Sequence, residues 1–320
     1  MPSNPKSVFI NEVKAGLSAR PRHLSSKWFY DAVGDKLFQA IMAMPEYYLT
    51  SAERDIYQSC GRDLLEAIGD YPFDLIELGA GDGSKTRFLI DTFISAGARF
   101  TYRPVDISAN AIAQLSGRVA REWPDLSYAP LNDDYFAALD QLGEPDGDTV
   151  RLILFPGANI GNFNPEEAAD FLRHLRQFLN PGDLLLTGFD LRKNPATILA
   201  AYNDPAGHTA AFNLNLLRRI NNELGGDFEL EQWRHWETYD PLSGAARSYI
   251  VSLAEQRVAI GALGESYSFE AWEAISVEVS QKYGKREIEA LALAAGFTHL
   301  RHFTDDRVLF SDSLWKVGSK

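Results

Sequence analysis

The 320-residue sequence has a single cysteine, Cys60, and no apolar run long enough to cross a membrane. One cysteine excludes an internal disulfide, which is typical of a protein from a reducing compartment. A membrane-spanning helix needs roughly 18 or more apolar residues in succession. The first twenty residues carry several charges and lack the apolar centre of a signal peptide. We therefore expect no membrane association and a cytoplasmic location.

Basic residues are also scarce relative to acidic ones. The chain has 31 Lys and Arg against 44 Asp and Glu, a net charge of −13. Such a surface repels phosphate backbones, so we expect no nucleic-acid partner. The six histidines show no metal-ligand spacing, and we expect no metal ion. We expect a monomer that acts on a small molecule, because no assembly motif is evident.

Strand-like and helical segments alternate from about residue 72 to residue 192. Amphipathic helices separate apolar stretches that we predict to be strands, at 73–78, 100–108, 126–134, 149–157 and 180–191. This alternation predicts an α/β fold with a mainly parallel sheet and helices on both faces. Ligands of such folds bind at the carboxyl ends of the strands.

The remaining residues predict a second, α+β domain. The best helical candidates are 25–44 and 195–226, and strand-like segments follow at 247–255 and 274–283. The last forty residues resume the first pattern, with a helix and two strands. The simplest organisation has a sheet domain of 52–192 and 283–320, and a second domain of 1–51 and 193–282. We expect a ligand-binding cleft between them.

The segment DLIELGAGDGSKT, residues 74–86, is a glycine-rich turn that follows a strand. A dinucleotide-binding turn, G-x-G-x-x-G, requires glycine where this chain has Ser84. Glu77, Gly79, Gly81 and Gly83 instead match the E/D-x-G-x-G-x-G turn of class I methyltransferases, which bind S-adenosylmethionine. The motif therefore favours a methyl donor over NAD. An NAD oxidoreductase and a turn without a ligand remain alternatives.

Other features resemble class I methyltransferases. Asp106 ends the second predicted strand, where a carboxylate can bind ribose hydroxyls of either adenosine-bearing ligand. FLNPGDLLL (178–186) resembles the L-x-P-G-G-x-L turn before the fifth strand of these enzymes. NDD (132–134) ends the predicted third strand, where they often place an acid near the adenine. The closing helix and strand pair resembles their sixth and seventh strands, the seventh antiparallel. We therefore expect a Rossmann-like, mostly parallel seven-stranded sheet.

Longer stretches resemble one family, the histidine-specific Nα-methyltransferases of ergothioneine biosynthesis. They are KWFYDAVGDKLFQAIMAMPEYYLTSAE, IELGAGDGSKT, PVDIS, FPGANIGNFNP and AAYNDPAGHTAAFNLNLLRRINNELGGDF. The resemblance runs from about residue 14 to the end. It implies an S-adenosylmethionine-dependent enzyme that trimethylates the α-amine of histidine to hercynine.

The resemblance also implies a set of site residues. Tyr30 and Asn162 are the implied catalytic residues. The implied substrate-binding residues are Tyr47, Gly157, Asn162, Tyr202, Ser248, Glu278 and Ser280, of which Glu278 and Ser280 would contact the imidazole. The implied cofactor-binding residues are Gly79, Gly81, Lys85, Asp106, Asp134 and Tyr135.

The sequence departs from the family pattern in three places. VEVSQKY (277–283) keeps the glutamate and the serine of the family but differs in their neighbours. Ala158 and Asn159 stand where a Ser-Thr pair is usual, and Ser248 where a methionine commonly lines the imidazole pocket. We therefore interpret the side-chain pocket as altered and the donor site as intact. The alternatives are methyl transfer to another amino acid or small amine, and a non-catalytic amine-binding protein.

Overall fold

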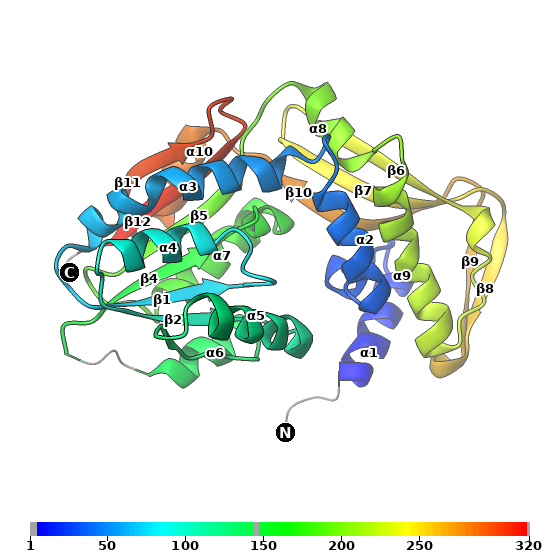
Figure 1. The fold of residues 1–320 in the computed structure, drawn as a ribbon. Coiled ribbons are helices and arrows are strands. Elements are labelled where there is room, and N and C mark those ends of the chain that lie inside the picture. Colours follow the sequence, from blue (N-terminus) through cyan, green and yellow to red (C-terminus); the bar gives the residue numbers. More distant parts are fainter. Residues whose placement is uncertain (1–4, 144–146, 319–320) are drawn as a thin grey trace. The chain divides into compact units, whose positions relative to one another are not determined.

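A computed structural model of the chain describes residues 5–143 and 147–318 (Figure 1). The chain divides into two compact units, each made of two segments. Met1–Tyr48 and Lys193–Ser280 form what we call the three-stranded unit. Leu49–Arg192 and Gln281–Lys320 form the seven-stranded unit. Within residues 5–143 and 147–318, no helix has the length and apolar content of a membrane span.

The seven-stranded unit is built on a sheet with the strand order β11-β12-β5-β4-β1-β2-β3. Strands β1 to β5 pair in parallel, whereas β12 is antiparallel to both of its neighbours. The strands are β1 (Phe73–Leu78), β2 (Phe100–Val105), β3 (Ser127–Tyr128), β4 (Val150–Phe155), β5 (Leu184–Asp190), β11 (Phe297–Thr304) and β12 (Phe310–Val317). This topology confirms the predicted α/β class and the antiparallel last strand.

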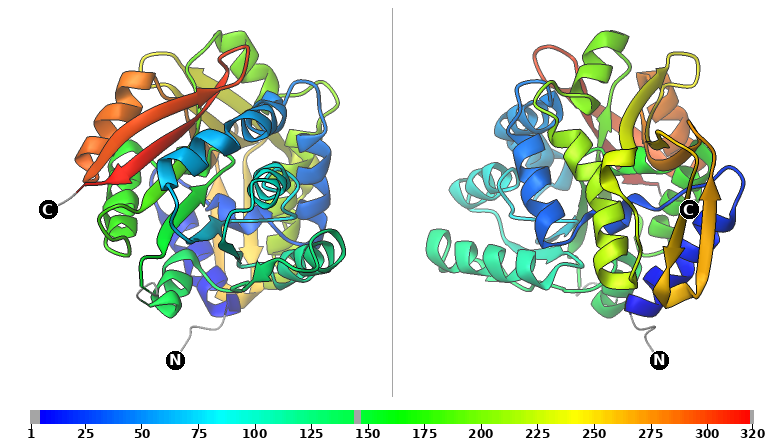
Figure 2. Two further views of the ribbon diagram at one scale, coloured as in Figure 1. Left: turned by 60° about the vertical axis from the view of Figure 1, so that its left-hand side comes forward. Right: turned by 90° about the vertical axis from the view of Figure 1, so that its right-hand side faces the viewer.

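Helices cover both faces of this sheet, because alternate residues of the buried β1 point to opposite sides. Ile76 and Leu78 pack on one side in a core shared with α6 (Tyr135–Leu142), α7 (Pro165–Arg176) and α10 (Lys285–Ala294). Phe73 points to the other side, where its ring centroid lies 5.4 Å from that of Phe93. That side carries α3 (Tyr48–Ile68), α4 (Arg87–Ser95) and α5 (Ala109–Glu122). Figure 2 shows α10 beside the β11–β12 hairpin.

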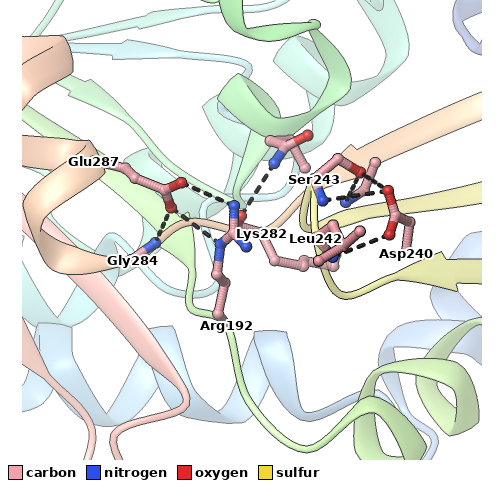
Figure 3. Close-up of polar contacts among 9 residues, drawn as sticks. Arg192, Asp240, Leu242, Ser243, Lys282, Gly284 and Glu287 are labelled. Carbon is pink, nitrogen blue, oxygen red and sulfur yellow. Dashed lines mark hydrogen bonds and ion pairs between the residues drawn. The ribbon is translucent and has the colours of Figure 1, made fainter.

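The three-stranded unit combines helices with a sheet of order β10-β7-β6 and a separate β8–β9 pair. Apolar residues of α9 pack against Ile250 and Ile275 of the sheet, and Figure 1 shows α9 along it. Asp240 closes the β6–β7 hairpin by accepting N–H groups of Leu242 and Ser243 (Figure 3). The helices are α1 (Pro5–Ser18), α2 (Ala32–Met42), α8 (Pro195–Tyr202) and α9 (His208–Leu224), with short 3₁₀ turns at Ser26–Phe29, Leu230–Gln232 and Gly261–Leu263. The strands are β6 (Trp233–Asp240), β7 (Ala245–Ser252), β8 (Gln256–Ile260), β9 (Glu265–Phe269) and β10 (Ala274–Gln281).

Two predicted helices are each divided by an aspartate. The candidate at 25–44 breaks before α2, where Asp31 accepts the N–H groups of Val33 and Gly34. The stretch at 195–226 breaks between α8 and α9, where Asp204 accepts N–H groups at the start of α9. Aspartate satisfies N–H groups that a helix start leaves unbonded, and this favours a new helix over a continuous one.

Strand predictions also need correction. The strand expected at 126–134 is only Ser127–Tyr128, so Asp134 does not end a strand. Strands β6, β8 and β9 were not predicted. They belong to antiparallel pairings, β6 with β7 and β8 with β9, and local apolar pattern indicates such short strands weakly.

The chain leaves the seven-stranded unit and re-enters it at neighbouring points (Figure 3). Leu191 bridges Tyr283, and Lys282 forms a fully buried ion pair with Asp190 at 2.8 Å. Arg192 donates two hydrogen bonds to Glu287, at 2.8 and 3.0 Å, and Glu287 also accepts the Gly284 N–H at the start of α10. The two points at which the chain leaves and re-enters this unit are therefore fixed by ion pairs as well as by backbone pairing.

Candidate functional site

The glycine-rich turn lies at the carboxyl end of β1. Gly79, Gly81 and Gly83 have φ values of 77°, 54° and 64°, a region that other residues rarely adopt. A Cβ atom on Gly79 would lie 3.0 Å from the Tyr135 hydroxyl and 3.6 Å from the Asn159 amide nitrogen. The turn therefore requires glycine at position 79 for both conformation and space.

Asp106 ties this turn to the end of β2. Its Oδ2 accepts the Gly81 N–H at 2.9 Å, and its Oδ1 accepts the Ser108 N–H at 2.8 Å. The carboxylate is thus fixed beside the turn, as the sequence predicted from its position after β2. A carboxylate held at a strand end can accept hydrogen bonds from ribose hydroxyls.

Asp134 and Tyr135 begin α6, and they differ in environment. Asp134 is exposed and caps the helix, because its Oδ1 accepts the N–H groups of Phe136 and Ala137. Tyr135 reaches the glycine turn, and burial raises the pKa of its hydroxyl to about 12. The structure thus brings Tyr135 to Gly79, whereas Asp134 is a helix cap and not the end of a strand.

Glu77, the acidic residue of the motif, lies in the buried strand β1 and supports the turn through hydrogen bonds. It is 2% exposed and accepts hydrogen bonds from the hydroxyls of Thr86 and Tyr102. Burial raises its pKa from 4.5 to about 7, against the opposite effect of these two donors. Glu77 thereby links β1 to β2 and to the start of α4, so its role in the motif is to position the turn.

Glu53 of α3 is a residue that the sequence analysis missed. Its carboxylate pairs with Lys85 and accepts the Gly157 N–H at 2.6 Å, so it joins the turns after β1 and β4. Glu53 is 1% exposed, and Gly188 makes room for it, since a Cβ there would lie 2.6 Å from its Oε1. Burial and Glu53 raise the pKa of the neighbouring Asp312 well above its ordinary range. Lys85 and Glu53 therefore form a charge pair between the turns, with Asp312 beside it.

The turn after β4 contains Ala158 and Asn159, two of the residues in which this chain departs from the family pattern. Ala158 has a φ of 57°, an uncommon conformation for a residue with a side chain. The amide nitrogen of Asn159 would lie 3.5 Å from a Cβ on Gly157 and 3.6 Å from one on Gly79. The Asn159 amide thus lies beside both glycine turns, and its assignment to the side-chain pocket stays a prediction. Asn162 is exposed at the end of this short helical turn, Asn159–Asn162.

In the three-stranded unit, the predicted tyrosines form a connected group. Tyr47 packs edge-on against Tyr202 and against Phe38, with ring centroids 6.3 Å apart in both pairs. Tyr30 packs edge-on against Phe38 at 5.5 Å and is 46% exposed. The Tyr202 hydroxyl hydrogen-bonds the Ser280 hydroxyl at 2.8 Å. The structure therefore brings together Tyr47, Tyr202 and Ser280, with Tyr30 one ring away.

His235 contacts the backbone of Tyr202 and holds that residue in position. Its Nε2 lies 3.0 Å from the Tyr202 carbonyl oxygen, and its Nδ1 lies 2.8 Å from the Asn213 amide nitrogen. Burial lowers the pKa of this histidine, which favours the neutral ring. Both ring nitrogens have partners within the unit, so His235 is a positioning residue.

Two glutamates flank Ser248 on the three-stranded sheet. Ser248 on β7 donates to Oε2 of Glu237 on β6 at 2.6 Å, and its Oγ lies 3.5 Å from Oε2 of Glu278 on β10. Glu237 pairs with Ser248 in the strand register and is 9% exposed. Serine in place of methionine thus produces a line of two carboxylates and a hydroxyl across three neighbouring strands.

Two of these residues had a signal in the sequence that the analysis did not use. Glu53 falls in the buried stripe of α3 with Leu49, Ala52 and Ile56, where an acid is unusual. Glu237 alternates with exposed residues of β6, and shares its buried face with Trp233 and His235. An acid on an apolar face indicates a buried partner in both cases.

The residues of the seven-stranded unit fit S-adenosylmethionine. The turn offers bare backbone at three glycines, a fixed carboxylate at Asp106 and a tyrosine hydroxyl at Gly79. S-adenosylmethionine has no phosphates, and its adenosine carries the ribose hydroxyls that such a carboxylate accepts. This set matches the motif on which the cofactor was predicted.

Comparison with known proteins gives the family. The model of the S-adenosylmethionine-dependent histidine-specific methyltransferases matches residues 9–317. Histidine N-alpha-methyltransferase of Mycobacterium tuberculosis is 35% identical over 303 residues, which cover 95% of this chain and 93% of the relative. Ergothioneine biosynthesis protein 1 of Neurospora crassa is 31% identical over 288 residues, 89% of this chain and 32% of the relative.

Among solved structures, magnesium protoporphyrin IX methyltransferase from Synechocystis, with bound SAH, aligns at 14% identity and a TM-score of 0.48. The alignment covers 92% of this chain and 98% of that one. The glycine turns, the sheet topology and the family match over nearly the whole length lead to one conclusion. The chain belongs to the S-adenosylmethionine-dependent histidine-specific methyltransferases, and it is an N-methyltransferase.

Proposed function

We propose that the enzyme transfers three methyl groups to the α-amine of L-histidine and forms hercynine. In this proposal the seven-stranded unit binds the cofactor and the three-stranded unit binds the side chain of the substrate. The observation that carries the choice of histidine is the line Glu237–Ser248–Glu278, together with the family match.

This line is suited to a side chain that donates hydrogen bonds. Ionised carboxylates only accept, whereas an imidazolium ring has two N–H groups to donate. Hydrogen bonds between a cation and a carboxylate are about twice as strong as those between neutral groups. Glu278 would accept one ring N–H, and Ser280 on the same strand face would contact the ring beside Tyr202. Glu237 would add negative charge through Ser248.

The α-amine needs alignment more than a strong base. A free α-amine has a pKa of roughly 8, so a usable fraction is neutral near neutral pH. When bound, S-adenosylmethionine supplies an electrophilic methyl group on a sulfonium. Alignment of the two reactants can contribute on the order of 7 kcal/mol or more to lowering the barrier. We assign alignment of the amine to Tyr30 and Asn162, and binding of the carboxylate to Tyr47, Tyr202 and the turn at Gly157.

Cofactor binding is assigned to the glycine turn after β1 and to residues at the end of β2 and the start of α6. Gly79 and Gly81 would give backbone contact, Asp106 would accept the ribose hydroxyls, and Tyr135 and Asp134 would lie near the adenosine. Lys85 is held by Glu53, and that pairing supports a role in shaping the turn along with any direct contact.

Isothermal titration with L-histidine in the presence of S-adenosylhomocysteine tests the proposal. We expect saturable heat, and a reaction with S-adenosylmethionine that gives trimethylated histidine by mass spectrometry. An absence of both heat and methylated histidine would exclude histidine as the substrate.

The role of Glu278 can be separated from a structural one. Glu278→Ala should weaken histidine binding by roughly tenfold or more, as for the loss of a hydrogen bond to a charged group, and leave the cofactor Kd unchanged. Glu255→Ala, which removes an exposed acid of the same unit, is the matched control. Equal losses of histidine and cofactor affinity would indicate that Glu278 stabilises the fold instead.

A second candidate keeps the chemistry and changes the substrate to another amino acid or small amine. It is favoured by Ser248, because two carboxylates and a hydroxyl also suit other cationic side chains. A screen of the twenty amino acids and common amines for cofactor turnover distinguishes the two. Turnover with histidine at the highest kcat/KM supports the first proposal, and a higher value for another amine supports the second.

A further inference from the structure

Two histidines of β11 lie on the same side of the strand because of a β-bulge. His299 pairs with Trp315 and Arg301 with Leu314, so Leu300 is an extra residue in the register. In a regular strand, residues three apart point to opposite faces. The bulge reverses that alternation, and the ring centroids of His299 and His302 lie 4.2 Å apart.

Helix α10 adds a carboxylate to this pair. His302 Nε2 lies 3.4 Å from Glu289 Oε1, and one ligand atom from each of Glu289, His299 and His302 lies within 4.8 Å of the others. A cation bound tetrahedrally at about 2.1 Å would place its ligand atoms about 3.4 Å apart. The His302–Glu289 distance already has this value, and small side-chain rotations would bring in His299.

The Nε2 atoms of the two histidines are not satisfied by ordinary hydrogen bonds. Among the described residues, the Nε2 atom of His299 is buried without a hydrogen-bond partner, and that of His302 has the 3.4 Å contact with Glu289. The His302 side chain is 10% exposed, and its Nδ1 lies 3.3 Å from the Ser311 hydroxyl on β12. Histidines that bind metals usually use their second nitrogen in this way, and the bond orients the ring. A buried nitrogen without a partner, such as His299 Nε2, is costly, which suggests a ligand at this point.

We propose that Glu289, His299 and His302 bind a divalent transition-metal ion, with Zn²⁺ as the best match. Two imidazoles and one carboxylate are a ligand set typical of Zn²⁺, and water would complete the coordination. Glu289, which is 49% exposed, gives the ion access from solvent. Lys285, one turn earlier on α10, places a positive charge near the site. Its repulsion would weaken the binding of a cation, but its side chain takes none of the ligand positions.

The bound ion would have a structural role. The three ligands come from α10 and β11, with Ser311 of β12 behind them, so the ion would join the helix to the hairpin shown in Figure 2. β11 is the edge strand of the sheet, whereas the glycine turns follow β1 and β4 in its middle. The proposal is therefore independent of the substrate and of methyl transfer. Spacing in the sequence did not indicate it, because only the bulge makes H-x-x-H a ligand pair in a strand.

The test uses the full chain after treatment with a chelator and its removal. Titration with ZnCl₂ should give one site per chain and a higher melting temperature, since an ion that binds only the folded state stabilises it. Binding of CoCl₂ should give the visible absorption of a low-coordinate Co²⁺ site. Glu289→Gln and His299→Gln should each weaken Zn²⁺ binding by about tenfold or more.

His208→Gln, a histidine change outside the cluster, is the control and should leave the Zn²⁺ Kd unchanged. Glu289 is half exposed, so its substitution should leave the fold intact, which circular dichroism can verify. Failure to bind one Zn²⁺ per chain would overturn the proposal. Binding with unchanged affinity in both cluster variants would also overturn it, and would show that the metal is an adventitious ion only.

Discussion

The two units present different kinds of binding surface. In the seven-stranded unit, the candidate cofactor site is made of backbone: three glycines with positive φ form the turn, and the buried pair of Glu53 and Lys85 lies beside it. In the three-stranded unit, the candidate substrate surface is made of side chains: tyrosine rings, hydroxyls and two carboxylates lie on a small antiparallel sheet. A cofactor shared by many enzymes can be bound by main chain, whereas a particular substrate requires particular side chains.

The supports of the two surfaces differ as well. Glu77 and Glu53 are at most 2% exposed, so they would act on the donor site through the position of the turns and, for Glu53, through Lys85. Ser248 and Glu278 belong to the proposed contact surface itself. Substitutions in the first group should therefore change stability and cofactor affinity together, and those in the second should change substrate affinity alone.

The largest effect that we expect is on the pH dependence of stability, through Glu77. Because burial raises its pKa from 4.5 to about 7, the folded state holds this proton more tightly than the unfolded chain. The contribution of Glu77 to stability is therefore lost as pH rises from 4.5 to 7, by up to about 3 kcal/mol. Relative to the parent, Glu77→Gln should gain stability progressively across this window in urea unfolding experiments. Exposed Glu66→Gln is the control, and an equal gain there would contradict the assignment.

Gly79→Ala should damage the donor site. Its Cβ would require a strained φ of 77° and a 3.0 Å contact with Tyr135, which together cost about 1–3 kcal/mol. We expect the Kd for S-adenosylmethionine to rise by roughly 10- to 100-fold in titration calorimetry. Gly97→Ala is matched to it, with a φ of 71° and nothing within 4 Å of the added Cβ. If both variants lose cofactor affinity equally, strain alone explains the loss.

Glu53→Gln and Asp312→Asn should change the free energy of unfolding by different amounts. Glu53→Gln removes the carboxylate that pairs with Lys85, and should lower the free energy of unfolding by about 1–3 kcal/mol. Asp312→Asn should lower that free energy by less, because burial and the neighbouring Glu53 raise the pKa of Asp312 and so oppose its ionisation. Thermal and urea unfolding measure both. Equal destabilisation would show that the two carboxyl groups share the charge.

The smallest expected effect is at Ser248. Ser248→Ala removes the hydroxyl between Glu237 and Glu278, which should cost about 1 kcal/mol of substrate binding, or about fivefold in Kd. Cofactor affinity should stay unchanged. Ser252→Ala removes a comparable hydrogen bond on the same strand and serves as the control. Loss of cofactor affinity in Ser248→Ala would contradict the division of roles between the units.

The sequence predicted much of the fold because its strongest signals are local. A buried parallel strand such as β1 reads as an apolar run, and the turn after it reads as glycines at fixed spacing. The antiparallel strands β6, β8 and β9 lack such runs, and aspartates at 31 and 204 divide helices that look continuous.

The candidate site was predictable to a similar degree. Asp106 and Tyr135 lie at the glycine turn as expected, and Tyr202 contacts Ser280. The Asn159 amide lies beside both glycine turns, and Asp134 caps a helix. Glu53 and Glu237 were missed, since their partners are distant in the chain. The roles assigned to these residues toward cofactor and substrate remain proposals.

The sequence by itself predicted the mostly parallel sheet and a turn that favours a methyl donor, because strand runs, helix starts and glycine spacing act over a few residues, and its resemblance over nearly the whole chain indicated the family. Only the tertiary structure decided which charged and polar groups contact one another. Glu53 lies under Gly157, Ser248 between two carboxylates, and His299 beside His302 across a bulge. These contacts join residues whose separation in the chain carries no local pattern, and a single extra residue in a strand changes which side chains share a face.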